Sequence, residues 1–225
     1  MRPTDLKPPV SREKRSVLIH DRVWYVPQVP LSSNEFLFPG WSHPDLFGND
    51  NPIHIEYCSG NGVWIAEKAI ANPFVNWVAV ERKFDRVRKI WAKIKNFNLT
   101  NMIVMCGEGY QATKRYIPNQ SVGEISINFP DPWPKARHAK HRLIQSEFIQ
   151  EMGRIIAPQG TLMFVTDDKL HSQWFIKKVA THPGFTSVYP DPYYTTDLNA
   201  YGSSFFDELW RSQGRSIYYH KFMRS

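Results

Sequence analysis

Acidic side chains stand at or just after the ends of four apolar segments that have the composition of short strands. They are Glu56, Glu81, Glu108 and Asp131. A single acid at such a position often caps the helix that follows. Four acids at corresponding positions, each at the end of a predicted strand, are harder to explain as helix caps alone. Because ligands of open parallel sheets bind at the carboxyl ends of the strands, these residues predict a site lined by carboxylates.

The turn after the first of these segments narrows the choice of ligand. The stretch CSGNG (58–62) joins a strand to a helix, and such a turn lets a ligand approach the backbone closely. Glu81 follows the turn at the distance at which an acid can accept both hydroxyls of an adenosine ribose. This pair fits either a dinucleotide used in hydride transfer or S-adenosylmethionine used in methyl transfer.

Further features favour the methyl donor. A pyrophosphate needs glycines that make room for it, whereas this turn keeps Cys58 and Ser59. Glu56 would repel a diphosphate but suits a cationic amino-acid group, and Glu108 suits the amino group of adenine. The sequence shows no His or Tyr–Lys pattern typical of nicotinamide chemistry.

A proline-rich segment surrounds the fourth carboxylate in the stretch NFPDPWPKARHAKHR (128–142). Pro130 and Pro132 restrict the backbone of Asp131 and of Phe129 before it, which favours extended conformations. We expect a preorganised carboxylate at the mouth of the site. The alternative is a rigid turn with a packed Trp133, whose ring either joins the core or stacks on a base.

Basic residues follow at once and are predicted to run into the next helix, although cations are unfavourable at a helix N-terminus. Phosphate at this place would explain them. The run consists of Lys135, Arg137, His138, Lys140, His141 and Arg142. We expect the two histidines to be phosphate or helix-start contacts rather than catalysts.

A second basic surface is predicted on the helix after Glu81. With a net charge of +7 and a pI near 9.4, these residues favour a polyanion such as nucleic acid over solvated faces. The surface contains Arg82, Lys83, Arg86, Arg88, Lys89, Lys93 and Lys95.

The elements that must position these residues alternate between strand and helix. This alternation predicts an α/β fold with a mostly parallel seven-stranded sheet, helices on both faces and an antiparallel hairpin at one edge. The predicted strands are 54–58, 75–80, 102–106, 122–128, 161–166, 185–189 and 216–222. The predicted helices are 63–70, 84–96, 112–116, 141–156 and 170–180.

Residues 1–50 are rich in proline and predict an extended or partly ordered arm before a domain at 51–225. Arg12–Arg15 and Arg22 in this arm could touch a nucleic-acid backbone. Cys58 and Cys106 form no metal or disulfide pattern, and no apolar run is long enough to cross a membrane. We therefore expect a soluble, cytoplasmic protein without a bound metal.

The stretch NFPDPWPKARHAKHR resembles the signature of bacterial tRNA (guanine-N7)-methyltransferases, and the resemblance covers about residues 50 to 222. It implies the Rossmann-like class I methyltransferase fold and S-adenosylmethionine as co-substrate. It also implies methyl transfer to N7 of guanine at position 46, in the variable loop of tRNA. The implied partner is tRNA, with no obligate protein partner, and the enzyme would be a monomer or homodimer.

The resemblance also implies roles for individual positions. The residues that match the family's methyl-donor site are Glu56, Glu81, Glu108 and Asp131, and Asp131 also matches its catalytic carboxylate. The residues that match tRNA-substrate contacts are Lys135, Asp167, Ser204 and Asp207.

Departures from the family pattern are few. Cys58 replaces the first glycine of the turn, and Glu108 stands where Asp is common. The segment Ser204–Asp207 replaces a Thr-x-[Phe/Tyr]-Glu element with shorter side chains that keep the hydroxyl and the charge.

Rival interpretations remain. A methyltransferase acting on an exocyclic amine would have consecutive prolines after the polar residue, and Phe129 and Asp131 break that pattern. A catalytically inactive tRNA-binding protein of this fold would have lost the strand-end acids, which are present. The third alternative is a nicotinamide oxidoreductase.

Overall fold

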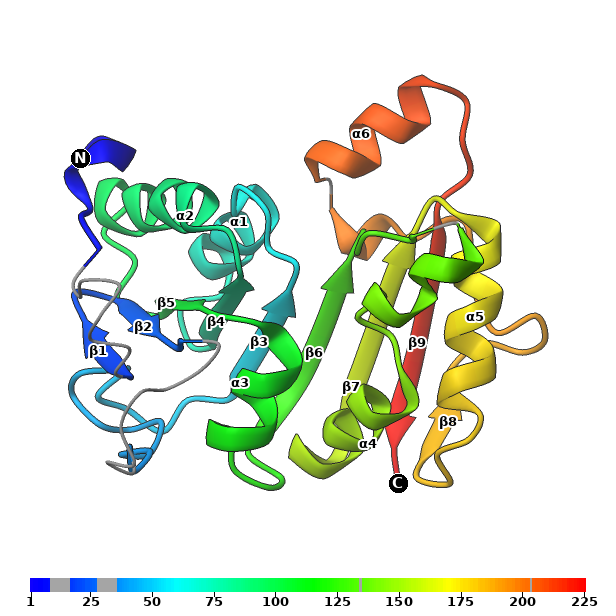
Figure 1. Cartoon of the computed structure of the whole chain (residues 1–225), viewed down its shortest axis with the longest axis horizontal. Helices are drawn as coiled ribbons and strands as arrows, with labels where there is room; N and C mark the ends of the chain where they lie inside the picture. The colour runs from blue at the N-terminus through cyan, green and yellow to red at the C-terminus, as the bar shows by residue number, and fades with distance from the viewer. Residues whose placement is uncertain (9–16, 28–35, 134, 203) are drawn as a thin grey trace. The chain divides into compact units, whose positions relative to one another are not determined.

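Alternating strands and helices build the chain, as its apolar periodicity predicts. The computed structural model describes residues 1–8, 17–27, 36–133, 135–202 and 204–225. It divides into two units, Met1–Ile117 and Pro118–Ser225, each with its own strands and helices (Figure 1).

Three parallel strands form the centre of the first unit. They pair in the order β3-β4-β5, and every residue of β4 is buried, as expected for a parallel strand covered on both faces. Helices α1 and α2 both pack against β4. The elements are β3 (Ile53–Tyr57), α1 (Val63–Ala71), β4 (Asn76–Glu81), α2 (Phe84–Asn96), β5 (Met102–Cys106) and α3 (Gly109–Tyr116).

A short hairpin extends this sheet beyond the predicted strands. Strand β1 (Leu18–His20) pairs antiparallel with β2 (Val23–Tyr25), and β2 pairs parallel with β5. The two residues between them, Asp21 and Arg22, have φ values of 49° and 68°. Left-handed conformations at both positions are those of a type I′ hairpin turn, which twists with its strands.

The hairpin lies within the predicted arm, after the 3₁₀ turn η1 (Pro3–Asp5). The division between an arm at 1–50 and a domain at 51–225 stays a prediction. Arg12–Arg15 lies outside the described residues.

The second unit combines one parallel pair with an antiparallel edge. Its strand order is β6-β7-β9-β8, with β6 and β7 parallel and the other pairs antiparallel, so the predicted C-terminal edge hairpin is confirmed. Helices α4 and α5 pack against β7. The strands and helices are β6 (Val122–Asn128), α4 (Ser146–Ile155), β7 (Ile156–Thr166), α5 (Lys169–Val179), β8 (Phe185–Ser187), α6 (Phe205–Ser212) and β9 (Tyr218–Arg224). Two 3₁₀ turns are η2 (Ala136–His141) and η3 (Asn199–Tyr201).

Two boundaries in this unit differ from the prediction. The basic run forms η2, and α4 begins only at Ser146 with the acid Glu147 in its first turn. The dipole argument for phosphate at that helix start was therefore wrong. Residues 157–160 (APQG) lie inside β7 rather than before it, and the pairing with β6 shifts register between Val122 and Glu124 to accommodate them.

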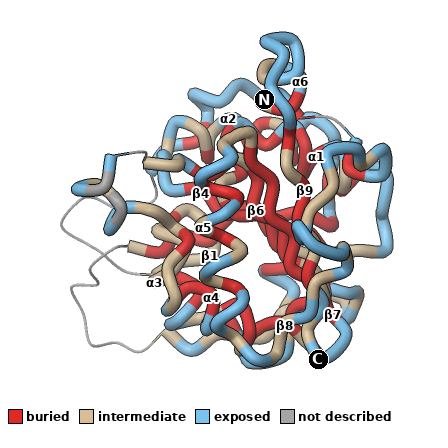
Figure 2. The backbone as a smooth tube through the Cα atoms, turned by 90° about the vertical axis from the view of Figure 1, so that its right-hand side faces the viewer, coloured by how far each residue is buried: buried red, intermediate tan, exposed pale blue. Residues whose placement is uncertain are grey.

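Burial follows the central strands in both units. Figure 2 shows these strand segments coloured as buried, while the edge strands β1 and β8 contain no buried residue and most loops are exposed. Of the helices in the described ranges, none combines the length and the apolar composition that crossing a bilayer requires.

Candidate functional site

The first unit brings three of the predicted acids to one edge. Because β3, β4 and β5 are parallel, their carboxyl ends lie side by side. Glu56 is the penultimate residue of β3, Glu81 is the last of β4, and Glu108 follows β5. Glu56 and Glu81 are only 2% and 6% exposed. The strand register thus explains why acids distant in sequence share one edge.

The turn after β3 adopts left-handed backbone conformations at alternate positions. Cys58, Gly60 and Gly62 have φ values of 63°, 55° and 69°. A Cβ at Gly62 would lie 2.7 Å from Cγ1 of Ile90, so only glycine fits there. Cys58, which stands where the family pattern has glycine, adopts this left-handed conformation at some conformational cost.

Glu81 links the turn to β4. Its Oε2 accepts a hydrogen bond from the Gly60 N–H at 3.1 Å, and its Oε1 accepts one from the Lys83 N–H at 2.8 Å. The Arg86 guanidinium lies 3.7 Å from Oε2. A carboxylate offers about four lone-pair positions, so each oxygen keeps capacity for a further donor. The residue thus fits the ribose diol of S-adenosylmethionine.

Glu108 caps helix α3. Its two oxygens accept hydrogen bonds from the Tyr110 N–H at 3.1 Å and the Gln111 N–H at 2.8 Å. The capping alternative is thus confirmed for this residue, although each oxygen retains a lone pair.

Cys106, the last residue of β5, has an unreactive thiol. Burial and the charge of Glu81 raise the pKa of this thiol to about 12. Cys106 therefore stays protonated and is not a nucleophile.

The second unit holds Asp131 in a loop with unusual backbone geometry. Phe129 has a φ of 46° and Trp133 a φ of 42°, both left-handed. The extended conformation expected for Phe129 before a proline was wrong: its N–H donates to the Val165 carbonyl at 2.9 Å, and this bond holds the turn. Asp131 itself is exposed.

Arg142 stabilises the backbone of this loop through hydrogen bonds. Its Nε donates to the Pro132 carbonyl at 2.8 Å and its Nη2 to the Trp133 carbonyl at 3.1 Å. The guanidinium also lies 4.8 Å from the ring centroid of Trp174. Sequence reasoning assigned Arg142 to phosphate, whereas these contacts give it a structural role. The planar guanidinium group can donate to two carbonyls at once in a fixed geometry, which explains why the position is Arg rather than Lys.

The remaining basic residues of the run differ in their contacts and exposure. The rings of His138 and His141 lie 5.7 and 5.4 Å from the Trp133 ring, so these side chains pack on the loop. Lys135 is exposed, as are Arg137 and Lys140. These three cations remain available to a polyanion.

The basic helix α2 also uses part of its charge internally. Arg88 donates from Nε to the Leu6 carbonyl at 3.1 Å, and Lys95 forms an ion pair with Asp21. Together with Arg86 beside Glu81, these contacts hold the unit together. The predicted polyanion surface is therefore smaller than the sequence suggests.

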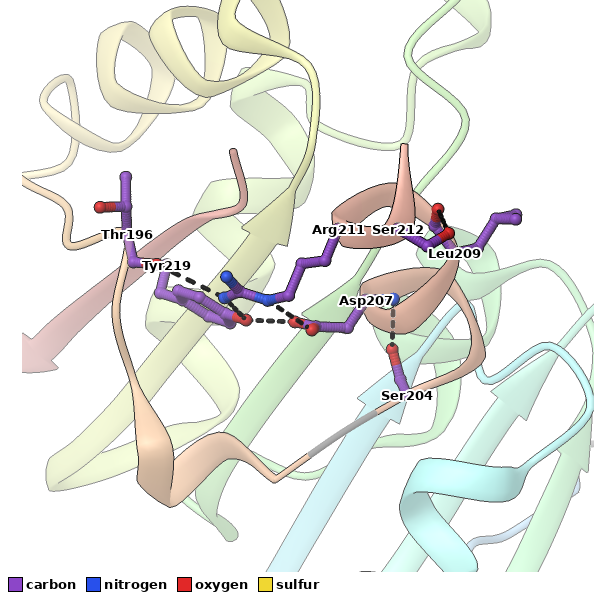
Figure 3. A network of polar contacts seen from close by, with 7 residues as sticks. All are labelled: Thr196, Ser204, Asp207, Leu209, Arg211, Ser212 and Tyr219. Carbon is purple, nitrogen blue, oxygen red and sulfur yellow. Dashed lines mark hydrogen bonds and ion pairs between the residues drawn. The ribbon is translucent and has the colours of Figure 1, made fainter. Parts of the chain in front are cut away.

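The predicted substrate residues Asp167, Ser204 and Asp207 meet around α6. Asp207 is 4% exposed, pairs with Arg211 Nε at 2.8 Å and accepts a hydrogen bond from the Tyr219 hydroxyl (Figure 3). Ser204 caps the helix by accepting the Asp207 N–H at 3.2 Å. Asp167 accepts from Arg215 Nη1 at 2.6 Å.

The hydroxyl of Tyr219 stays protonated, and so remains a hydrogen-bond donor, throughout the neutral pH range. Burial, and then the hydrogen bond to Asp207, raise the pKa of Tyr219 to about 12. The hydroxyl also accepts from Arg211 Nη2 at 2.9 Å. Three side chains thus form one closed network between α6 and β9, which sequence reasoning did not predict.

A signal for α6 was present in the sequence. Ser204 followed three residues later by Asp207 is the S-x-x-[DE] pattern of a helix N-terminus, and the structure confirms a helix there. Ser204 and Asp207 were assigned to the substrate site for their chemistry alone, and their role at the start of a helix was overlooked.

Comparison with known proteins places the chain in a family. A family model described as "Putative methyltransferase" matches residues 50–220. The tRNA (guanine-N(7)-)-methyltransferases of Chlamydia caviae and Chlamydia trachomatis are 43% and 42% identical to it, over 100% of this chain and 98% of each relative. The enzyme of that name from Staphylococcus aureus is 38% identical over 56% of the chain and 58% of its own length.

Solved structures support the fold. An S-adenosylmethionine-dependent methyltransferase from Aquifex aeolicus matches with a TM-score of 0.54 and 12% identity, covering 79% of this chain and 85% of that one. An rRNA methylase from Streptococcus thermophilus matches with a TM-score of 0.53 and 13% identity, covering 78% and 88%. The predicted Rossmann-like α/β class is confirmed, with more strands than the seven predicted. The chain therefore belongs to the bacterial tRNA (guanine-N7)-methyltransferase family, whose fold is that of the class I S-adenosylmethionine-dependent methyltransferases.

Proposed function

We propose that the protein transfers the methyl group of S-adenosylmethionine to N7 of the guanine at position 46 of tRNA. The observation that carries this proposal is the full-length similarity to relatives of that name, together with the signature around Asp131. In the first unit, Glu56, Glu81 and Glu108 hold the methyl donor. Glu81 supports this role because both of its oxygens keep free acceptor capacity at the end of β4.

The chemistry demands positioning more than proton transfer. Bound S-adenosylmethionine supplies an electrophilic methyl group on a sulfonium. Guanine N7 has an in-plane lone pair, which forms the new N–C bond as the S–C bond breaks, so no proton has to leave. The residues of the site therefore accelerate the reaction mainly by holding the base in line with the methyl group. Product guanine becomes cationic, and Asp131 stabilises that charge as it develops while also contacting the donor.

Different tasks follow for the substrate residues. Asp167 is 14% exposed and pairs with Arg215 through Oδ2, so we assign it to accept from N1–H and N2–H₂ of guanine. Ser204 and Asp207 act on the substrate indirectly, because their side chains hold α6 in place. Lys135, which is exposed beside the Asp131 loop, binds phosphate together with Arg137 and Lys140.

One assay tests the function directly. Labelled methyl transfer to an unmodified tRNA transcript, followed by nucleoside analysis, should give 7-methylguanosine. A transcript with adenine at position 46 should accept no label. A methylated exocyclic amine would favour the rival methyltransferase, and calorimetric binding of NAD in place of S-adenosylmethionine would favour an oxidoreductase. Either result would overturn the proposal.

The assigned role of Asp131 has its own test. Asp131→Ala should abolish methyl transfer while the unfolding transition remains that of the wild type, since the side chain is exposed. The exposed acid Glu147, in α4, provides the matched control Glu147→Ala, which should remain fully active. Full activity of Asp131→Ala would remove this residue from the mechanism.

We further propose that the enzyme works in the cytoplasm as a monomer or homodimer, without an obligate protein partner or a metal. The proposed substrate, tRNA, supports the compartment. Undiminished activity of the purified chain in EDTA would support the absence of a required metal and of an obligate protein partner. Activity that requires an added protein or a divalent cation would contradict it.

A further inference from the structure

Helix α6 buries a charged side chain and leaves its aromatic side chains exposed or only half-buried. Among its eight residues Asp207 alone is buried, at 4% exposure, whereas Phe205 is 59% exposed. Phe206 and Trp210 are half-buried. The hydrophobic effect normally turns a helix the other way, with its apolar stripe against the core. Figure 1 shows α6 beyond the carboxyl ends of β6 and β7, where it covers neither strand.

Polar contacts set this orientation. Asp207 is fixed by Arg211 and by the Tyr219 hydroxyl, as Figure 3 shows. Just beyond the helix, the Arg215–Asp167 pair ties the following segment to the end of β7. Because these contacts hold the helix by its polar side, the aromatic side is left facing outward. The protein thus maintains an apolar surface that its own core does not use.

The aromatic rings of α6 form a continuous strip with Phe129. The Phe206 ring lies 6.0 Å from Phe129, 5.3 Å from Phe205 and 6.5 Å from Trp210, stacked on the last at 17°. The Arg215 guanidinium lies 4.1 Å from the Trp210 ring centroid. The strip therefore begins two residues before Asp131 and ends at a cation.

This combination fits single-stranded nucleic acid better than it fits protein. Aromatic rings beside arginine are the usual platform for unpaired bases, because every base has a π-face and each nucleotide carries a phosphate. The chain's net charge of +7 complements such a partner.

We propose that α6 is a stacking platform for one unpaired base of the tRNA, the neighbour of the guanine that is methylated. Phe205 supplies the exposed ring, and Arg215, which lies against Trp210 at the other end of the strip, meets a phosphate of the same strand. The target guanine itself belongs at Asp131, and the ring of Phe205 is separated from Phe129 by the whole of Phe206. The platform thus binds the next nucleotide along the chain. This inference rests on the proposed function.

A set of substitutions at Phe205 tests the platform. Phe205→Ala should weaken binding of fluorescently labelled tRNA roughly tenfold, within the range of about 5- to 150-fold expected for one base stack. Phe205→Tyr should restore it and Phe205→Leu should not, since the ring is what matters. The slope of log affinity against log salt should stay unchanged, because no phosphate contact is lost.

Controls separate stacking from general damage. Phe74→Ala removes a ring that is 79% exposed but precedes the amino end of β4, so it should leave tRNA binding unchanged. Affinity for S-adenosylmethionine and the urea midpoint should be the same in all Phe205 variants. Equal losses for Phe74→Ala and Phe205→Ala, or wild-type binding by Phe205→Ala, would overturn the platform.

The base is located by a double-mutant cycle. tRNAs with an abasic site directly before or after the target guanine should bind the wild type more weakly. For one of them, Phe205→Ala should cause no further loss. An undiminished effect of Phe205→Ala on both abasic tRNAs would overturn the platform, as would a Phe205→Ala loss that arises from dissociation of a dimer.

Failure of the proposed function looks different. In that case the wild type would bind tRNA without forming 7-methylguanosine, whatever residue stands at position 205.

Discussion

The loop around Asp131 keeps two non-glycine residues in the left-handed region. Phe129 and Trp133 flank the Pro-Asp-Pro segment, and each such conformation costs on the order of 1–3 kcal/mol. Conformations of this kind persist only where neighbouring contacts hold them. Here the Phe129 N–H bonds to Val165, and Arg142 bonds to the two carbonyls that follow Asp131. The position of the carboxylate is therefore set by residues that do not touch substrate.

Arg142→Ala should lower kcat by about tenfold to a hundredfold, because a small misplacement of a catalytic group is costly. The free energy of unfolding should fall by about 1–3 kcal/mol as two carbonyls lose a charged donor. Steady-state kinetics and urea titration measure the two effects. Arg142→Lys should recover only part of the activity, since an ammonium cannot replace the fork. Wild-type kcat in Arg142→Ala would show that the loop holds without it.

Glu81→Ala should weaken binding of S-adenosylmethionine at least tenfold, roughly the effect of losing one charged hydrogen-bond acceptor. Glu81→Gln should be impaired too, because one oxygen becomes a donor that must face the N–H of Gly60 or of Lys83. Isothermal calorimetry measures both. Unchanged affinity in the alanine variant would remove Glu81 from the donor site.

At the scale of single residues, sequence patterns predicted the strand-end acids but not their supports. Glu56, Glu81 and Glu108 could be placed because parallel strands bring their ends together. Arg142 lies eleven residues beyond Asp131 and bonds to backbone, which a pattern of side-chain types does not reveal. The left-handed φ of Phe129 was hidden for the same reason, since local rules before proline favour the opposite conformation.

At the scale of elements, the long amphipathic or continuously apolar segments were predicted and the unusual ones were missed. Helix α2 and strands β5 and β6 have the predicted limits. Strands β1 and β2 have only three residues each, and their Asp21–Arg22 turn lacks the glycine that normally marks a type I′ hairpin. Helix α6 was missed because its apolar residues do not face the core.

Tyr219→Phe should loosen α6 without altering β9. Because burial keeps the pKa of Tyr219 at about 12, its hydroxyl donates to Asp207 throughout the neutral range. Its removal should lower the free energy of unfolding by about 1–2 kcal/mol. Chemical denaturation measures this loss, and Tyr218→Phe on the same strand should leave stability unchanged. A neutral Tyr219→Phe substitution would mean that the Asp207–Arg211 pair suffices.

At the scale of the whole molecule, two buried histidines make the fold sensitive to acid. Burial lowers the pKa of His171 and of His220 to about 4. The charge of Arg142 lowers the pKa of His171 further, while Asp168 and Asp131 oppose the shift. In the unfolded chain the pKa is near 6.5. Between these values the unfolded state binds more protons, so stability falls as the pH drops from about 6.5 to 4.

Each histidine should contribute about 3 kcal/mol to this loss over the full pH window. His171→Leu should make the pH dependence of unfolding shallower, because it removes one of the two groups. It should not cost stability at pH 7, since the ring nitrogens have no hydrogen-bond partner within the described residues. Urea titrations between pH 4.5 and about 7 test this. Replacing His43, whose side chain is 41% exposed, by Gln is the control and should leave the profile unchanged. A wild-type slope in His171→Leu would contradict the assignment.

The net charge of +7 predicts tRNA binding that weakens with salt. Lys135→Ala should reduce affinity for every tRNA tested and make the slope of log affinity against log salt shallower by about 1. Fluorescence anisotropy at several KCl concentrations measures the slope. Lys177→Ala removes an equally exposed charge in the last turn of α5 and should not change it. An unchanged slope in Lys135→Ala would mean that this lysine contacts no phosphate.

The inverted burial of α6 also has a consequence for motion. The only fully buried side chain of α6 is a carboxylate, and its apolar side chains are at most half-buried, so detaching the helix exposes less hydrophobic surface and costs less than unfolding the core. Its amide hydrogens should exchange with deuterium well before those of α4, which buries Phe148, Ile149 and Met152. Bound tRNA should slow that exchange selectively. Exchange at individual amides of α6 would then measure how long the substrate stays bound.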